Sequence, residues 1–568
     1  MDYRKEYLRW CEKASADADM AEELNNLKEE EIQDAFFSHL TFGTGGLRGI
    51  IGAGTNRMNR YTVAMASQGL ANYVIKNFPD NKRSIAISYD SRIKSSTFSK
   101  TAACVFAANG IKAFLFPQLM PTPCLSFAVR YLGCLAGVMI TASHNPSAYN
   151  GYKAYDADGC QITSKAAADI SAEITELDIF ADIKTIEFAK ALEKGAIQYI
   201  SNAVCETFFQ EVKKQSVLFG EKINKDQTII YSPLNGAGLM PVTRTLREMG
   251  YRRLIMVKEQ EHPDGNFPTC PYPNPEIRDA MVLGIEYARK FNGDLLIATD
   301  PDCDRVGIGV RDHSGEYTLL SGNETGILLF DYICRQRVTH NRMPSDPIMI
   351  KSIVTTELAE KIADNYGVKT INVLTGFKYI GEQIRLLEEK NEGERYIFGF
   401  EESCGYLSGS YVRDKDGVGA ALLICEMFSY YAAQEKNLLD KRNELYEQYG
   451  YYLDTLHSYT FEGFSGFLKM QSVMNFFRGN IPSVGGIRVK RCLDYSVGLW
   501  GLPSANVLKF QLENNCSVVL RPSGTEPKIK IYIGVSGMDR EKARALEGNI
   551  TKDIERIMQS NSMPNKLI

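Results

Sequence analysis

The chain lacks any apolar run that reaches the roughly 18 residues needed to cross a membrane. Its first residues, MDYRKEYLRWCEKASADADMAEEL, are charged and lack the apolar centre of a signal peptide. The net charge of the 568 residues is only -4, and no basic run stands out. We therefore expect no membrane partner and no nucleic-acid partner.

Pairs of cysteines with the Cys-x-x-Cys spacing are also absent. The thirteen cysteines are an odd number spread over a long chain. This pattern is typical of free, buried thiols in a reducing compartment. The expected location is therefore the cytoplasm.

Several common catalytic motifs are missing. Residues 42–49, Phe-Gly-Thr-Gly-Gly-Leu-Arg-Gly, are rich in glycine but lack the Walker spacing. No strand is expected before them, which argues against a dinucleotide-binding fingerprint. No Gly-x-Ser-x-Gly elbow surrounds Ser143, and only six histidines could serve as a base.

Alternating strand and helix patterns are abundant, and 44% of the residues are hydrophobic. Strands are expected at 84–89, 112–116, 135–141, 228–231, 254–257, 294–298, 348–350, 368–374 and 396–398, with helices between them. The last ~120 residues instead predict short antiparallel strands at 507–512, 517–520 and 529–533, then a helix over 540–558. The fold class expected is α/β, with three consecutive βαβ-type mixed-sheet domains and a C-terminal α+β domain.

Ser143 directly follows an expected buried strand, in the sequence Thr-Ala-Ser-His-Asn-Pro. The turn residues after it predict a hydroxyl exposed at the end of a sheet, where α/β proteins place their chemistry. An ordinary Ser/Asn-rich loop would have the same composition. His144 is either a group that positions a phosphorylated Ser143 or a structural hydrogen-bonding residue of the loop.

Asp300, Asp302 and Asp304 follow another expected strand at alternate positions. Three such carboxylates repel one another unless a cation lies among them, and oxygen ligands suit Mg²⁺. A calcium-binding EF-hand loop is excluded, because Arg305 stands where it requires glycine and Arg311 where it requires glutamate. The remaining alternative is a solvated acidic turn.

A phosphate-binding loop is expected at the sequence Arg-Pro-Ser-Gly-Thr. Its guanidinium, two hydroxyls and permissive glycine suit an anion with three equivalent oxygens, although a plain surface turn is also open. The residues concerned are Arg521, Ser523, Gly524 and Thr525.

Three further loops have weaker signals. Glu401 and Ser403 could bind vicinal sugar hydroxyls, but a helix capped at Ser403 is an equal alternative. Residues 375–378, Thr-Gly-Phe-Lys, could present an ammonium group to a phosphate, and Arg48 could meet an anion.

With these loops in this order, the chain resembles the α-D-phosphohexomutase superfamily from Phe42 to about Tyr532. Within it, the sequence is most similar to the phosphoglucomutase and phosphopentomutase branch. The resemblance implies four domains around a central cleft, each contributing one loop. Cys404, which follows Ser403, departs from the superfamily's pattern. This departure bears on which branch the chain is assigned to and not on the type of reaction.

The resemblance also implies roles for individual residues. Ser143 would be phosphorylated in the resting enzyme and would bind Mg²⁺ together with Asp300, Asp302 and Asp304. Arg48 and Lys153 would support phosphoryl transfer, with His144 beside them and Lys153 as candidate general base. The substrate-binding residues would be Arg305, Thr375, Gly376, Lys378, Glu401, Ser403, Arg521, Ser523, Gly524 and Thr525.

The four domains implied by the resemblance would have the following bounds. Domain 1 would span 1–210, with an N-terminal helical extension and the phosphoserine loop. Domain 2 would span 211–322 with the metal-binding loop, domain 3 would span 323–445 with the sugar-binding loop, and domain 4 would span 446–568 with the phosphate-binding loop.

The activity implied is that of an intramolecular phosphotransferase of the isomerase class. It would interconvert glucose 1-phosphate and glucose 6-phosphate through a phosphoserine enzyme, with glucose 1,6-bisphosphate as intermediate and activator. Open alternatives are a phosphopentomutase or phosphomannomutase with the same mechanism, and a catalytically silent sugar-phosphate-binding protein. Small-molecule sugar phosphates are the expected partners, and the protein would be a monomer or homodimer.

Overall fold

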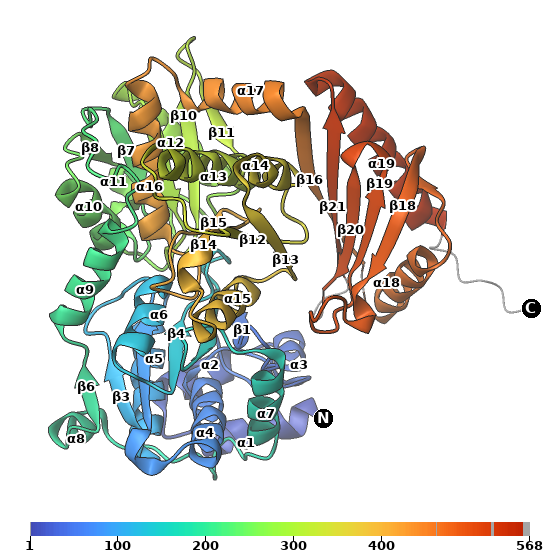
Figure 1. Ribbon diagram of the computed structural model, residues 1–568. Coiled ribbons are helices and arrows are strands. Elements are labelled where there is room, and N and C mark those ends of the chain that lie inside the picture. Colours follow the sequence, from blue (N-terminus) through green and yellow to red (C-terminus); the bar gives the residue numbers. More distant parts are fainter. Residues whose placement is uncertain (1, 462, 524–527, 561–568) are drawn as a thin grey trace, which may run out of the picture.

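A computed structural model describes residues 2–461, 463–523 and 528–560. It contains four sheets, which follow one another along the chain (Figure 1). The first three are mixed sheets flanked by helices and the fourth is antiparallel, so the expected fold class is confirmed. None of the helices in the described ranges has both the length and the apolar character needed to cross a bilayer.

The first sheet has the order β1-β5-β4-β2-β3-β6. Its strands are β1 (Leu47–Ile50), β2 (Ser84–Tyr89), β3 (Lys112–Leu115), β4 (Ala136–Ile140), β5 (Tyr149–Asp156) and β6 (Ile197–Tyr199). Its helices are α4 (Arg60–Asn77), α5 (Ser95–Ala108), α6 (Thr122–Tyr131), α7 (Ser164–Thr175) and α8 (Phe188–Glu193). Ile85 and Ile87 belong to a different buried cluster from Ala86, because alternate side chains of β2 face opposite sides of the sheet. Apolar layers thus cover both faces, as expected for parallel strands.

The second sheet has the order β11-β10-β9-β7-β8. Its strands are β7 (Ile229–Ser232), β8 (Leu254–Met256), β9 (Leu295–Thr299), β10 (Val306–Arg311) and β11 (Tyr317–Leu320). Helices α9 (Asn202–Lys213), α10 (Leu239–Glu248), α11 (Lys258–Glu261) and α12 (Arg278–Lys290) belong to this part of the chain. Strands β9 and β10 pair antiparallel, so the loop between them leaves and re-enters the sheet at one end.

The third sheet has the order β13-β12-β14-β15. Its strands are β12 (Ile348–Ser352), β13 (Lys369–Val373), β14 (Tyr396–Glu401) and β15 (Gly405–Leu407). Its helices are α13 (Gly322–Thr339), α14 (Leu358–Tyr366), α15 (Phe377–Glu389), α16 (Gly417–Ala432) and α17 (Leu438–Tyr449). One continuous buried cluster includes side chains from all of the first three sheets, which places these sheets around a shared core.

The fourth sheet has the order β16-β21-β20-β19-β18-β17 and a core of its own. Its strands are β16 (Tyr451–Thr460), β17 (Ser483–Val484), β18 (Ile487–Asp494), β19 (Leu508–Leu512), β20 (Ser517–Pro522) and β21 (Lys528–Gly537), with α18 (Gly463–Arg478) and α19 (Arg540–Ser560) against it. The sequence prediction found β19, β20, β21 and α19 but missed the others. A small apolar cluster joins this sheet to the third, for example Val354 with Tyr532.

The N-terminal extension is helical, as predicted. It consists of α1 (Tyr3–Lys13), α2 (Ala18–Asn26) and α3 (Glu29–Phe36). Trp10 is fully buried and contacts the rings of Phe36, Tyr61 and Phe180 edge-on. The extension is therefore packed onto the first sheet's helices by aromatic contacts.

Candidate active site

The loop after β4 holds Ser143 in the left-handed backbone region, at φ 52°. The backbone N–H of Ser143 donates to Thr141 Oγ1 at 2.7 Å, and that hydroxyl donates to Asp90 Oδ2 at 2.6 Å. Such a conformation costs free energy for a residue with a Cβ, and it persists because the surrounding hydrogen bonds determine it. The turn predicted from the sequence is present.

Arg92 also holds the loop after β4 in place. Its buried guanidinium donates to the carbonyl oxygens of Ser143, Asn145, Pro146 and Tyr149. One side chain thus binds three carbonyl groups of the loop and the first carbonyl group of β5, which fixes the position of the serine.

The hydroxyl of Ser143 donates to Asp300 Oδ2 at 2.8 Å and lies 3.1 Å from His144 Nδ1. The prediction that this hydroxyl is exposed was wrong, since Ser143 is only 3% exposed. The loop between β9 and β10 lies over it and covers the turn. Ser143 and the acidic loop therefore form one site.

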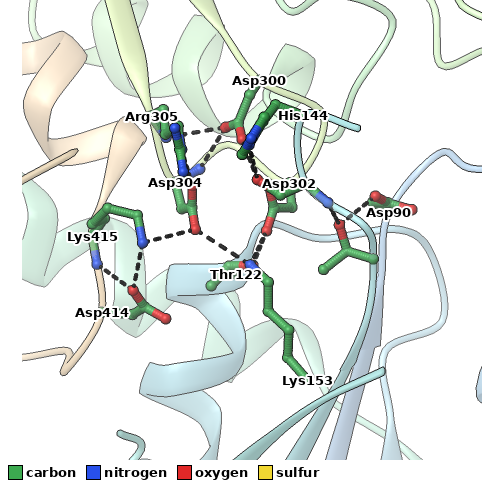
Figure 2. Close-up of polar contacts among 12 residues, drawn as sticks. Asp90, Thr122, His144, Lys153, Asp300, Asp302, Asp304, Arg305, Asp414 and Lys415 are labelled. Carbon is green, nitrogen blue, oxygen red and sulfur yellow. Dashed lines mark hydrogen bonds and ion pairs between the residues drawn. The ribbon is translucent and has the colours of Figure 1, made fainter. Parts of the chain in front are cut away.

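Asp300, Asp302 and Asp304 lie within the β9–β10 loop with carboxylate oxygens within 4.8 Å of one another (Figure 2). All three are buried, so the solvated-turn alternative is wrong. Asp302 Oδ1 and Asp304 Oδ1 are buried without a hydrogen-bond partner among the described residues. Three converging carboxylates, two of which have an unsatisfied oxygen, match the ligand preference of Mg²⁺, so this cluster is able to hold a divalent cation.

The Asn235-Gly236 turn supports the acidic loop. A Cβ on Gly236 would lie 2.4 Å from Pro301 Cα, and Ala237 N–H donates to Pro301 O at 2.8 Å. Only glycine permits this approach of two backbones.

Two lysines from other parts of the chain surround the acidic loop. Lys153 on β5 binds Asp302 Oδ2 at 2.7 Å and Asp304 Oδ2 at 3.4 Å. Lys415 comes from the segment before α16 and lies 3.2 Å from Asp304 Oδ2 (Figure 2). Both ammonium groups compensate charge that would otherwise be costly to bury.

The carboxyl groups of the loop differ in pKa. Burial, together with the neighbouring Asp302 and Asp304, raises the pKa of Asp300 well above its usual value. Burial also disfavours the charged form of Asp302, but its ion pair with Lys153 outweighs this and lowers its pKa. Although burial opposes it, the two carboxylates raise the pKa of Lys153, so the amine holds its proton in this arrangement.

His144, Arg48 and Arg305 lie where the acidic loop opens to the cleft. Burial and the two guanidinium groups lower the pKa of His144 well below its usual value, which favours the neutral ring. Arg48 on β1 donates to Asn145 Oδ1 at 2.8 Å. Arg305 is ion-paired with Glu276.

Glu401 is the last residue of β14, and Ser403 lies in the loop between β14 and β15. Glu401 Oε1 accepts a hydrogen bond from Gly376 N–H at 2.7 Å, which joins this loop to residues 375–378. Ser403 lies in the turn between two strands, so the alternative of a helix capped at Ser403 was wrong.

A cluster of cations occupies the fourth sheet where it faces the cleft. Arg521 on β20 pairs in register with Lys530 on β21, and Lys528 lies nearby. Burial and the charges of Arg521 and Lys528 lower the pKa of Lys530. Burial and Arg521 lower the pKa of Lys378 to about 8. Like charges held together in this way favour binding of an anion.

A cleft of about 740 Å³ connects these loops. The predicted residues that line it are Arg48, His144, Arg305, Thr375, Gly376, Glu401, Ser403 and Arg521. The others among the described residues, Ser143, Lys153, Asp300, Asp302, Asp304, Lys378 and Ser523, are not part of this lining. Gly524 and Thr525 lie outside the described residues.

Sequence reasoning missed Lys415, Lys528 and Lys530 as residues of the site. Lys415 belongs to the run Arg-Asp-Lys-Asp-Gly, whose alternating charges and glycine were an available signal. Lys528 and Lys530 alternate along β21, which is a signal for two side chains on one face.

The family models for phosphoglucomutase/phosphomannomutase α/β/α domains I, II and III match residues 39–179, 206–315 and 321–449. The chain is 39% identical over 548 residues to a phosphoglucomutase of Staphylococcus saprophyticus, which covers 93% of this chain and 96% of that protein. A phosphoglucomutase of Staphylococcus aureus is 36% identical over 524 residues, or 90% and 92% of the two chains.

Solved structures share the fold at low sequence identity. Parafusin, a phosphoglucomutase from Paramecium in its open form, aligns with a TM-score of 0.70 at 18% identity and covers 93% of this chain and 97% of that one. A phosphoglucomutase/phosphomannomutase family protein from Burkholderia thailandensis aligns with a TM-score of 0.67 at 16% identity, with 92% and 97% covered. These likenesses support the fold.

Proposed function

Because the chain belongs to the phosphoglucomutase/phosphomannomutase family, we propose that it interconverts glucose 1-phosphate and glucose 6-phosphate. The chain is an enzyme of the isomerase class, an intramolecular phosphotransferase. The observation that carries the proposal is the cleft, which is lined by Arg521, Lys528 and Lys530 and also by His144. His144 lies 3.1 Å from the hydroxyl of Ser143, which in turn contacts the cluster of three aspartates behind the lining. A mutase needs both a reacting phosphate site and a second site for the other phosphate.

In the proposed cycle, Ser143 is phosphorylated in the resting enzyme. Its Oγ–P bond breaks while a bond forms between that phosphorus and a free hydroxyl of the sugar monophosphate. Glucose 1,6-bisphosphate results, turns over in the cleft, and returns its other phosphate to Ser143. The bisphosphate also serves as activator, because it can phosphorylate a dephosphorylated enzyme.

The cation site would be formed by Ser143, Asp300, Asp302 and Asp304. When bound, Mg²⁺ would neutralise charge on the transferring phosphoryl oxygens. Arg48 would contribute positive charge at the same group, and His144 would orient Ser143. Lys153 is proposed to take the proton of the attacking hydroxyl, for which its amine must first be neutral. Although burial opposes it, Asp302 and Asp304 raise the pKa of Lys153 and so favour its protonated form. A cation bound to these aspartates would offset their charge and lower the pKa of Lys153.

The substrate's ends are assigned to different loops. Glu401 and Ser403 would bind sugar hydroxyls, with Thr375 and Gly376 beside them. Arg521, Ser523, Gly524 and Thr525 would bind the phosphate that does not react. Arg305 and Lys378 would assist at the substrate.

The proposed protein has four domains, which span residues 1–210, 211–322, 323–445 and 446–568. Small-molecule sugar phosphates would be the partners of a cytoplasmic monomer or homodimer.

The decisive experiment is a panel of hexose and pentose 1-phosphates with Mg²⁺, followed by phosphorus NMR. Glucose 1-phosphate should give glucose 6-phosphate, and a catalytic amount of glucose 1,6-bisphosphate should shorten any lag. A kcat/KM for ribose or deoxyribose 1-phosphate at least tenfold above that for glucose 1-phosphate would make the protein a phosphopentomutase. Binding without turnover of any sugar would instead indicate the silent sugar-phosphate-binding protein.

A further inference from the structure

A second large cavity lies on the first domain and shares no lining residue with the active-site cleft. Its volume is about 620 Å³, which is in the range of small-molecule sites. It lies between the end of α1, one face of α4 and α5, and residues 179–186. The proposed mutase cycle does not use it.

The wall of this cavity is apolar and held in place. Tyr61 and Phe180 contact each other edge-on at 5.5 Å, and both rings pack against the buried Trp10. Ile183 and Ile186 are half-buried beside them. Rigid aromatic and aliphatic groups facing a cavity favour a flat apolar ligand group.

All the charged residues that line the cavity are cations: Lys13, Arg60 and Lys100. Lys13 lies 3.2 Å from Glu12, but both side chains are exposed and this pair is therefore weak. Arg60 lies 3.1 Å from Asp17, whose side chain is only 13% exposed, so this carboxylate compensates part of the charge of Arg60. The three cations still outnumber the two carboxylates paired with them, in a chain whose net charge is -4. Hydroxyls of Thr97, Thr101 and Thr185 complete the polar lining.

We propose that this cavity binds a nucleoside phosphate. The base would lie against the apolar wall, the phosphates would meet the three cations, and the threonine hydroxyls are suited to a ribose. A sugar phosphate offers the charge without the flat apolar group, so the ligand differs in class from the proposed substrate. The site does not depend on the proposed reaction.

The test is isothermal titration calorimetry with ADP, adenosine and pyrophosphate as probes, in the presence of saturating glucose 1-phosphate to fill the cleft. ADP should bind, and adenosine and pyrophosphate should bind at least about tenfold more weakly, because each lacks half of the interactions. If pyrophosphate bound with the same affinity as ADP, the cavity would be a general anion-binding site and the proposal would be refuted. Absence of ADP binding would also overturn the proposal.

Two matched variants locate the binding. Lys100→Gln should weaken ADP binding at least fivefold, whereas Lys82→Gln, an exposed lysine on the same domain outside the cavity, should not. Both substitutions are on the surface, and equal melting temperatures would verify folding. ADP binding that is unchanged in Lys100→Gln would place the ligand elsewhere and refute the assignment.

Discussion

Replacing Arg521 by alanine tests whether the fourth sheet holds the substrate's non-reacting phosphate. Arg521 lies in register with Lys530 and near Lys528, so three cations face one side of the cleft. Loss of one charged hydrogen-bonding partner of a desolvated phosphate costs on the order of 2–4 kcal/mol. KM for glucose 1-phosphate should therefore rise by roughly 30- to 1000-fold.

The expected cost is at the lower end of this range for a structural reason. In the ligand-free protein, Arg521 repels Lys530 and helps to lower its pKa. Removing Arg521 relieves that repulsion, so Lys528 and Lys530 would retain part of the affinity. The double variant Arg521→Ala/Lys530→Ala should then lose more than the sum of the two single losses.

The assay couples glucose 6-phosphate formation to NADP reduction by glucose 6-phosphate dehydrogenase. Arg488→Ala is the matched control, since Arg488 is an exposed arginine of β18 in the same sheet and outside the cleft. Saturating glucose 1,6-bisphosphate should still phosphorylate Ser143 in the Arg521 variant, because the reacting end is intact. An unchanged KM would refute the assignment of this phosphate site.

Three further perturbations test the rest of the site. Ser143→Ala should remove several orders of magnitude of activity while the fold stays intact. The +80 Da species expected on the Ser143 peptide of the parent should be absent from the variant, and near-normal turnover would exclude Ser143 as the nucleophile. Asp302→Asn should weaken activation by Mg²⁺, since it removes one of three anionic ligands, and full activity of the parent after rigorous chelation would contradict the metal site. Because protonated Lys378 would favour a bound phosphate and its pKa is lowered to about 8, KM should rise as the pH increases through about 8, and Lys378→Met should show no such rise.

Much of the fold follows from local sequence patterns. The prediction of a strand over 84–89 matches β2, and the helix expected between the strands at 84–89 and 112–116 matches α5, which ends at Ala108 before Gly110 at φ 75°. These elements are long, periodic and bounded by turn residues, so short-range physics determines them. Strand β16 was missed because only Tyr452 among its side chains is buried and the others are half-buried or exposed, so its apolar pattern is weak.

The candidate residues, too, were predicted largely from their position after strands. Ser143 and the three aspartates each follow a buried strand, and a strand end is where α/β folds place chemistry. Local pattern could therefore name these residues, but it said nothing about the distance between them.

Tertiary structure alone decided that Ser143 and Asp300, 157 positions apart, share a hydrogen bond. It also decided that Ser143 is buried and that Lys415 lies beside Asp304. Each of these contacts joins loops of different sheets, and packing of whole domains sets their distance. The sequence determined which side chains stand at the ends of its strands, whereas burial, charge compensation and pKa arise only when the sheets pack together and exclude water from between those loops.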